Sequence, residues 1–157
     1  MTPEHRAIIE AIRASAAAVR GAVETLRPGR EGIAPRAGEW SARETLIHLR
    51  AAAMLVHGLR IRRLLYEDEP VFADFDEARY RRATLERDEP VQDLVEGIVA
   101  EHEQIARLLA TLPDADWERA GRHPSLGVMS IELLARRTAE HAREHAAQIA
   151  STAKDRA

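Results

Sequence analysis

Two histidines near the end of the chain, His141 and His145, have the residue type and the spacing of a metal-binding pair. Residues four apart on a helix lie one above the other on the same face, so both imidazole rings can reach one metal ion. The spacing alone is weak evidence, because seven histidines in 157 residues produce such pairs by chance. The face that the pair occupies, and a third ligand from elsewhere in the chain, therefore decide the question.

The helix that carries this pair is predicted to begin after Ser130, whose hydroxyl suits a helix cap. Steps of three and four residues define one stripe along the helix. This stripe contains Leu134, Thr138, His141, His145 and Ile149. Both histidines are therefore expected to point inward.

A third histidine, His48, lies on the inward face of another predicted helix. Ser41 and Glu44 form a capping box at its start, and its pattern continues to Tyr66. His57 lies nine residues after His48, which is half a rotation on a regular α-helix, so we expect His57 to face solvent. The inward stripe of this helix contains His48, Ala52, Leu55 and Leu59.

Three further amphipathic segments supply the remaining helices. Apolar residues at helical spacing predict one long helix over 3–26 and another over about 90–112, with Asp88 or Glu89 at the cap of the second. A short arginine-rich helix is predicted over about 76–85.

No segment shows the alternation of a strand, and 27–39 and 120–129 have the glycines and prolines of irregular connections. We therefore predict an all-α fold, in which a single domain over 1–157 forms a four-helix bundle with one short extra helix.

The composition excludes several classes of function. The chain has no cysteine, which excludes disulfides, thiolate metal ligands and a cysteine nucleophile. Its net charge of -3, with acidic and basic residues interspersed, provides no basic stripe for nucleic acid. No apolar run approaches the roughly 20 residues that span a membrane, and the first residues lack the apolar region of a signal peptide. We expect a cytoplasmic protein that acts on a small-molecule substrate.

The three inward histidines, His48, His141 and His145, need partners if they are buried, because each neutral ring has one donor and one acceptor. A shared divalent ion would take one nitrogen from each ring and keep a position open to water, as in catalytic metal sites. The alternative is a set of core histidines, each with its own hydrogen-bond partners. The residues alone leave both interpretations open.

Several stretches of the chain resemble, in order, the motifs of the DinB/YfiT-like superfamily. The first is 40–49, with Trp-Ser, a glutamate and His-Leu, and the second is the tryptophan turn at 117–119. The third begins with Gly-Arg-His-Pro at 121–124 and ends with the histidine pair and Gln-Ile at 141–149. One departure is Ala142, which stands where many relatives place an aspartate.

The resemblance implies a four-helix bundle of unusual connection order, with one divalent metal ion held by His48, His141 and His145. Zinc or nickel is the expected ion, and iron and copper also suit three imidazoles. The resemblance further implies a metal-dependent hydrolase, or a transferase that uses a low-molecular-weight thiol such as mycothiol or bacillithiol.

Two other residues are candidates for catalysis. Glu44 lies one turn before His48 and could act as a general base, although its place in the capping box already explains it. His123 could line the mouth of the site, or it could order the loop that precedes the last helix.

Two rival hypotheses come from other classes of protein. The first is a non-catalytic, stress-related bundle that serves as a binding or dimerisation module, so a homodimer is a candidate assembly. The second is a ferritin-like di-iron protein, which is disfavoured because Glu140 and Glu144 turn away from the histidine stripe.

Overall fold

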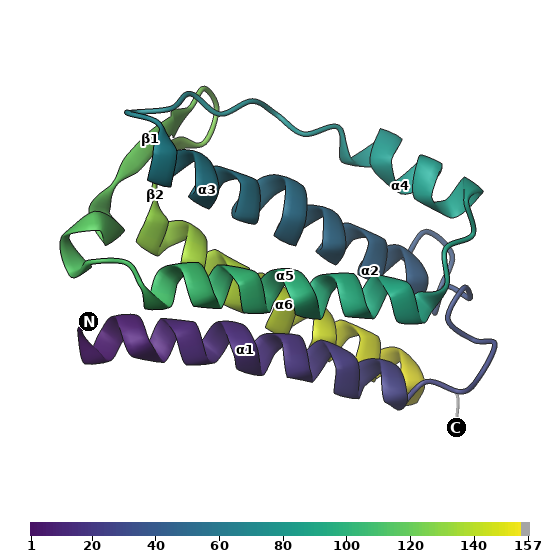
Figure 1. Ribbon diagram of the computed structural model, residues 1–157. Coiled ribbons are helices and arrows are strands. Elements are labelled where there is room, and N and C mark those ends of the chain that lie inside the picture. Colours follow the sequence, from purple (N-terminus) through teal and green to yellow (C-terminus); the bar gives the residue numbers. More distant parts are fainter. Residues whose placement is uncertain (155–157) are drawn as a thin grey trace.

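The computed structural model describes residues 1–154, and four long helices dominate it (Figure 1). The second of these helices is continuous but changes character, because a π-helical segment, η1, separates two α-helical parts. The four are α1 (Pro3–Glu24), then α2 (Ala42–Ala51) with η1 (Ala52–Gly58) and α3 (Leu59–Tyr66), then α5 (Val91–Ala110), and α6 (Ile131–Lys154). The short predicted helix is α4 (Glu77–Glu86), so the predicted all-α bundle with one extra helix is confirmed.

The helices are not joined in simple up-and-down order. Both α1 and the α2–α3 helix pack against α5 and α6 and make only sparse contact with each other, so they lie diagonally opposite. In Figure 1, α1 and α6 run in one direction, while the α2–α3 helix and α5 run in the other. Residues 67–90, a crossover segment that includes α4, therefore return along the length of the bundle before α5 begins.

Local sequence explains where three of the helices begin. The Thr2 hydroxyl accepts a hydrogen bond from the His5 amide at 3.1 Å, and Pro3 occupies the first turn of α1. The predicted capping box of Ser41 and Glu44 is formed at the start of α2. The Ser130 hydroxyl accepts from the Leu133 amide at 3.1 Å, which confirms the predicted cap of α6.

The predicted cap of α5 is wrong. Pro90 precedes the first turn of α5, and no side chain caps it. Asp88 has a φ of 48°, in the left-handed region, which places it in the turn before the helix. Its carboxylate instead pairs with Arg43 at 3.0 Å, while Glu89 pairs with Arg50 at 2.6 Å.

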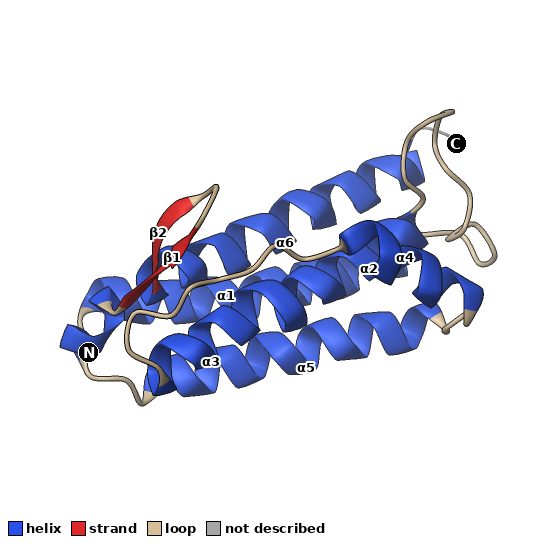
Figure 2. Cartoon of the chain, turned by 90° about the horizontal axis from the view of Figure 1, so that it is seen from above, coloured by secondary structure: helices blue, strands red, loops and turns tan. Residues whose placement is uncertain are grey.

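One segment predicted to be irregular contains a small β-sheet. Strands β1 (Ala120–His123) and β2 (Gly127–Ser130) pair antiparallel, near the end of the bundle where α6 begins (Figure 2). Strands of four residues are too short for alternation to reveal them. Gly127, the first residue of β2, has a φ of 80°, which suits glycine where the chain leaves the turn. Gly121 permits close packing on the crossover, because a Cβ there would lie 2.5 Å from the Pro70 carbonyl oxygen.

The predicted inward stripe of the α2–α3 helix is wrong beyond Ala52. Leu55 and Leu59 are 38% and 47% exposed, whereas Ile61 and Leu64 are buried. The i→i+5 turns of η1 contain more residues than α-helical turns, so the inward face shifts along the sequence after η1.

The same shift turns His57 toward the interior. His57 is half-buried, and the centre of its ring lies 5.8 Å from that of His141. The expectation that His57 faces solvent is therefore wrong, because it assumed a regular α-helical phase between His48 and His57.

Apolar side chains from all four long helices form the core. Trp117, in the 3-10 turn η2 (Asp114–Glu118), is fully buried and stacks on His5 with ring centres 4.0 Å apart. Among the residues that the structure describes, no helix combines the length and the apolar character that crossing a bilayer requires.

Candidate metal centre

Three imidazoles from two helices converge inside the bundle. His48 of α2 and His141 and His145 of α6 each offer one ring nitrogen, and these atoms lie within 4.8 Å of one another. Nε2 of His48 is 2.8 Å from Nε2 of His141, and the ring centres of the three pairs are 4.6 to 4.9 Å apart. Within the described residues, no other group of three or more metal-ligating side chains gathers in this way.

Two neighbouring side chains orient these rings. The Nδ1 atom of His145 is 2.8 Å from Oε1 of Gln148, one turn further along α6, so its Nε2 is free for another partner. The Nδ1 atom of His48 lies 3.0 Å from Oε1 of Glu77, although the contact lacks the alignment of a hydrogen bond. Carboxylate and amide oxygens behind histidine ligands are a common arrangement in metal sites.

Glu77 comes from α4, so the crossover segment covers one side of the histidine group. Its neighbour Arg81 places its guanidinium carbon 4.5 Å from the ring centre of Trp40. The Trp40 ring in turn lies 5.1 Å from that of His48. The short helix is therefore part of the wall around the site.

Burial, with repulsion from neighbouring charges, lowers the pKa values of His141, His48 and His57. Burial is the main cause that lowers the pKa of His141 to about 3, and the neighbouring histidines add to it. Burial also lowers the pKa of His48, against the opposing effect of Glu77, and it lowers the pKa of His57 to about 4. Neutral imidazole is the form that binds metal ions.

The donor set fits a divalent cation. The three rings present nitrogens to a shared space. A hydrogen bond between two neutral imidazoles uses the lone pair of only one of the two facing nitrogens, whereas a cation accepts a lone pair from each ring. The chemistry of the residues therefore agrees with one ion held by His48, His141 and His145.

The two predicted catalytic residues, Glu44 and His123, make local structural contacts. Oε2 of Glu44 accepts from the backbone N–H and the hydroxyl of Ser41, each at 3.0 Å, so its carboxylate is engaged at the helix start. His123 is buried, and its Nδ1 accepts from the amides of Ser125 and Leu126 at 3.2 and 3.3 Å, which orders the hairpin turn. Neither belongs to the histidine group.

Sequence reasoning missed His57, Glu77 and Gln148. Gln148 could have been found, because it lies one helical turn beyond His145. Glu77 comes to His48 through the crossover, for which no local pattern gives a signal, and His57 depends on the π-helical segment.

A pocket of about 420 Å³ opens beside the histidine group. His141 forms part of its wall, so the pocket reaches the histidine group. Its lining also carries charges of both signs. Its lining consists of His57, Leu133, Arg136, Arg137, Glu140, His141 and Glu144.

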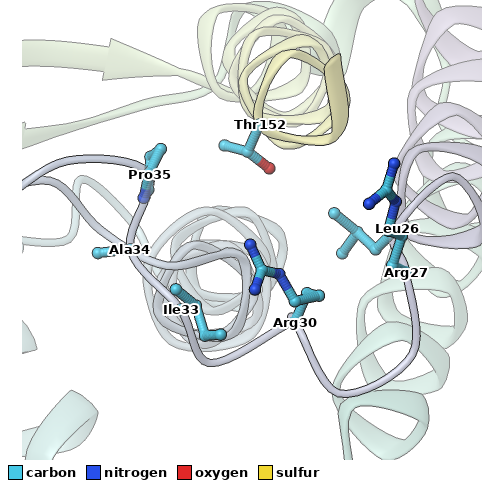
Figure 3. Close-up of a pocket in the computed structure, with 7 residues that line it drawn as sticks. All are labelled: Leu26, Arg27, Arg30, Ile33, Ala34, Pro35 and Thr152. Atoms are coloured by element: carbon cyan, nitrogen blue, oxygen red, sulfur yellow. The ribbon is translucent and has the colours of Figure 1, made fainter. Parts of the chain in front are cut away.

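A second hollow, shown in Figure 3, lies between the link that follows α1 and the end of α6. Arg27, Arg30 and Thr152 supply its polar atoms, and its volume is about 40 Å³. It has room for water rather than a substrate, and it contains no imidazole or carboxylate. The pocket beside His141 is therefore the better candidate for chemistry.

Comparisons with known proteins agree with this geometry. The family model described as the DinB superfamily matches residues 10–149. The chain is 31% identical over 150 residues to a Geobacillus kaustophilus protein named "Putative metal-dependent hydrolase GK0616", covering 93% of this chain and 82% of that protein. An Oceanobacillus iheyensis protein of the same description is 29% identical over 119 residues, which cover 76% of this chain and 68% of that one.

A solved structure has the same fold. YfiT from Bacillus subtilis, described as a probable metal-dependent hydrolase with an unusual four-helix bundle topology, superimposes with a TM-score of 0.87 at 21% identity. The match covers 98% of this chain and 89% of YfiT.

Proposed function

The chain belongs to the DinB superfamily, and we propose that it is a metal-dependent enzyme in which His48, His141 and His145 hold one divalent cation. The observation that carries this proposal is the convergence of three ring nitrogens within 4.8 Å, beside a pocket of about 420 Å³. Three protein ligands leave at least one position for water or substrate, as in catalytic sites. A closed site with four protein ligands would instead suit the non-catalytic binding module.

We propose hydrolysis as the reaction, because the relatives carry names of metal-dependent hydrolases. A bound cation would supply Lewis acidity, which lowers the pKa of a coordinated water toward ~7. The residues of the chain would hold the ligands in place: Glu77 lies behind His48, and Gln148 lies behind His145. Transfer of a low-molecular-weight thiol to an electrophile is the second reaction that such a site can support. The thiol can occupy the same position on the cation as the water.

The pocket volume of about 420 Å³ suits a small-molecule substrate. Zinc or nickel is the proposed ion, with iron and copper as alternatives that three imidazoles also accept. A cytoplasmic location and a homodimeric state are proposed with it, and sedimentation of the purified chain tests the second.

The test is metal analysis of protein purified without an affinity tag and reconstituted with zinc or nickel. We expect about one ion per chain. His48→Ala, His141→Ala and His145→Ala should each abolish binding. Arg143→Gln is the matched control, because Arg143 is exposed and lies between the two histidines of α6. Wild-type protein that binds no ion after reconstitution would overturn the proposal.

The reaction is then tested with the metal-loaded protein. Ester and amide substrates report hydrolysis, while mycothiol, bacillithiol and glutathione with a generic electrophile report thiol transfer. Activity that disappears in His48→Ala identifies the reaction. Metal binding without activity in any of these assays would favour the binding module.

A further inference from the structure

His57 is a fourth imidazole at the edge of the candidate metal centre. Its ring is roughly perpendicular to that of His141, at an interplanar angle of 78°, and it lines the pocket of about 420 Å³. His57 lies outside the group whose ring nitrogens converge within 4.8 Å. Neither of its ring nitrogens has a hydrogen-bond partner among the described residues, so its donor and its acceptor are available to a ligand.

The placement of His57 depends on an unusual backbone. The π-helical segment η1 brings this ring to the face that carries His48, and such segments occur frequently at functional sites. Gly58 lets the segment pack closely, because a Cβ at this position would lie 2.2 Å from Oε1 of Glu101. Glu101 is itself held by an ion pair with Arg62 at 2.6 Å.

Two guanidinium groups lie near His57 and lack carboxylate partners. Arg60 is 7% exposed, and its Nη2 donates to the carbonyl oxygen of Ala73 at 3.1 Å. Arg137, one turn before His141, is exposed, lines the pocket and forms no ion pair within the described residues. Both arginines act on His57, since each contributes to lowering its pKa.

Charges of the opposite sign are present but are exposed. Asp74 is the carboxylate that acts on Arg60, and its side chain is 90% exposed. Glu140 and Glu144 line the same pocket, and both are exposed. Hydration and salt screen these exposed carboxylates and the exposed Arg137 alike. The guanidinium of Arg60 is buried and forms no ion pair within the described residues, so it favours an anion on the side of His57.

We propose that this pocket receives an anionic oxygen group of the substrate, with the His57 N–H as hydrogen-bond donor and Arg137 as countercharge. His57 does not hold the metal ion in this arrangement. It is a substrate-binding residue that acts beside the three ligands. The inference rests on the proposed metal centre, and it adds the substrate class, namely compounds that carry a carboxylate, phosphate or similar oxyanion.

The test uses full-length protein reconstituted with cobalt(II), whose visible absorption reports both metal binding and anion binding. Acetate is the probe. His57→Ala should retain about one cobalt ion per chain, and its dissociation constant for acetate should rise about tenfold, as loss of one hydrogen bond to a charged group implies. Arg137→Gln should give a loss of similar size.

Two further variants make the result specific. His57→Gln keeps an N–H donor and should bind acetate within about threefold of wild type. Met54→Ala is the matched control, because Met54 is 41% exposed in the same π-helical segment. Loss of cobalt in both His57 variants, while Met54→Ala retains it, would make His57 a ligand and overturn the inference.

Unchanged acetate affinity in His57→Ala and Arg137→Gln would also overturn the inference. Wild-type protein that gives no cobalt spectrum would instead overturn the proposed metal centre, so the two failures are distinguishable.

Discussion

Nε2 of His48 lies 2.8 Å from Nε2 of His141, although the two residues are 93 positions apart in the chain. The α2–α3 helix packs against α6, and this contact brings the single histidine to the pair. Burial of both rings favours their neutral forms. The bundle therefore pre-organises donors that can bind a cation without first losing protons at neutral pH.

Glu77 should strengthen metal binding through His48. We expect Glu77→Gln to weaken zinc affinity about tenfold or more, because removing the oxygen partner of a ligating histidine typically has this effect. A competition titration with a chromophoric chelator measures the change. Glu86→Gln is the control, since Glu86 is exposed at the other end of α4. Equal affinities for the two variants would show that Glu77 does not orient His48.

Regular periodicity was sufficient to predict that His48, His141 and His145 face one another. The phase of α6 placed His141 and His145 on the stripe that also contains buried Leu134 and Ile149, and the structure confirms it. The capping box fixed the start of α2, so the phase of His48, seven residues after Ser41, was also correct. Both predictions concern short distances along regular α-helix, over which errors of phase stay small.

The same reasoning failed where the backbone departs from α-helical geometry. One π-helical segment changed the phase between His48 and His57, and no residue type in 52–58 signals such a segment. Contacts made through the crossover were also invisible, because Glu77 reaches His48 only after α4 packs on α2. The short strands lie beside the crossover, and Arg122 bonds to Pro70 and Phe72 through backbone groups that every sequence has.

Gly58 should be required for the π-helical segment. We expect Gly58→Ala to reduce the free energy of unfolding by about 1–3 kcal/mol, because its methyl group would lie 2.6 Å from the backbone oxygen of Ala53 and 2.2 Å from the Glu101 carboxylate. Gly21→Ala is the matched control, for which we expect the free energy of unfolding to increase. Gly21 lies in α1 with no atom within 4 Å of its ideal Cβ, so alanine should stabilise the helix by about 0.5–1 kcal/mol. Urea denaturation measures both changes, and stabilisation by Gly58→Ala would contradict the close approach.

Substitutions at Glu44 and Ser41 can distinguish a catalytic role of the Glu44 carboxylate from its role in the capping box. Glutamine at this position can still accept from the Ser41 amide, so Glu44→Gln should change the free energy of unfolding by less than about 0.5 kcal/mol. Ser41→Ala removes the hydroxyl that accepts from the Glu44 amide at 3.2 Å and should cost about 1 kcal/mol. If Glu44→Gln leaves the protein stable and abolishes a metal-dependent activity, Glu44 is the general base after all.

The buried histidines should make the metal-free protein less stable in mild acid. Their folded-state pKa values lie below the ordinary value of 6.5, at about 3 for His141 and about 4 for His57. Between these values and 6.5 the unfolded chain binds more protons, so stability is complete above about pH 6.5 and falls as the pH decreases. We expect the Tm of metal-free protein to be lower at pH 5 than at pH 7.5. Circular dichroism at the same ionic strength for both pH values measures this difference.

A histidine variant can show that the histidines, and not the carboxylates, cause the lower Tm at pH 5. His141→Gln removes one of the groups with a lowered pKa, so the difference in Tm between pH 5 and pH 7.5 should be smaller than in wild type. Glu103 and Asp114 have pKa values lowered to about 2 by their hydrogen bonds, and they titrate mainly below pH 5 in either state. They therefore contribute little to this window. A Tm that is the same at pH 5 and pH 7.5 in wild-type protein would show that the histidines are not held neutral by burial.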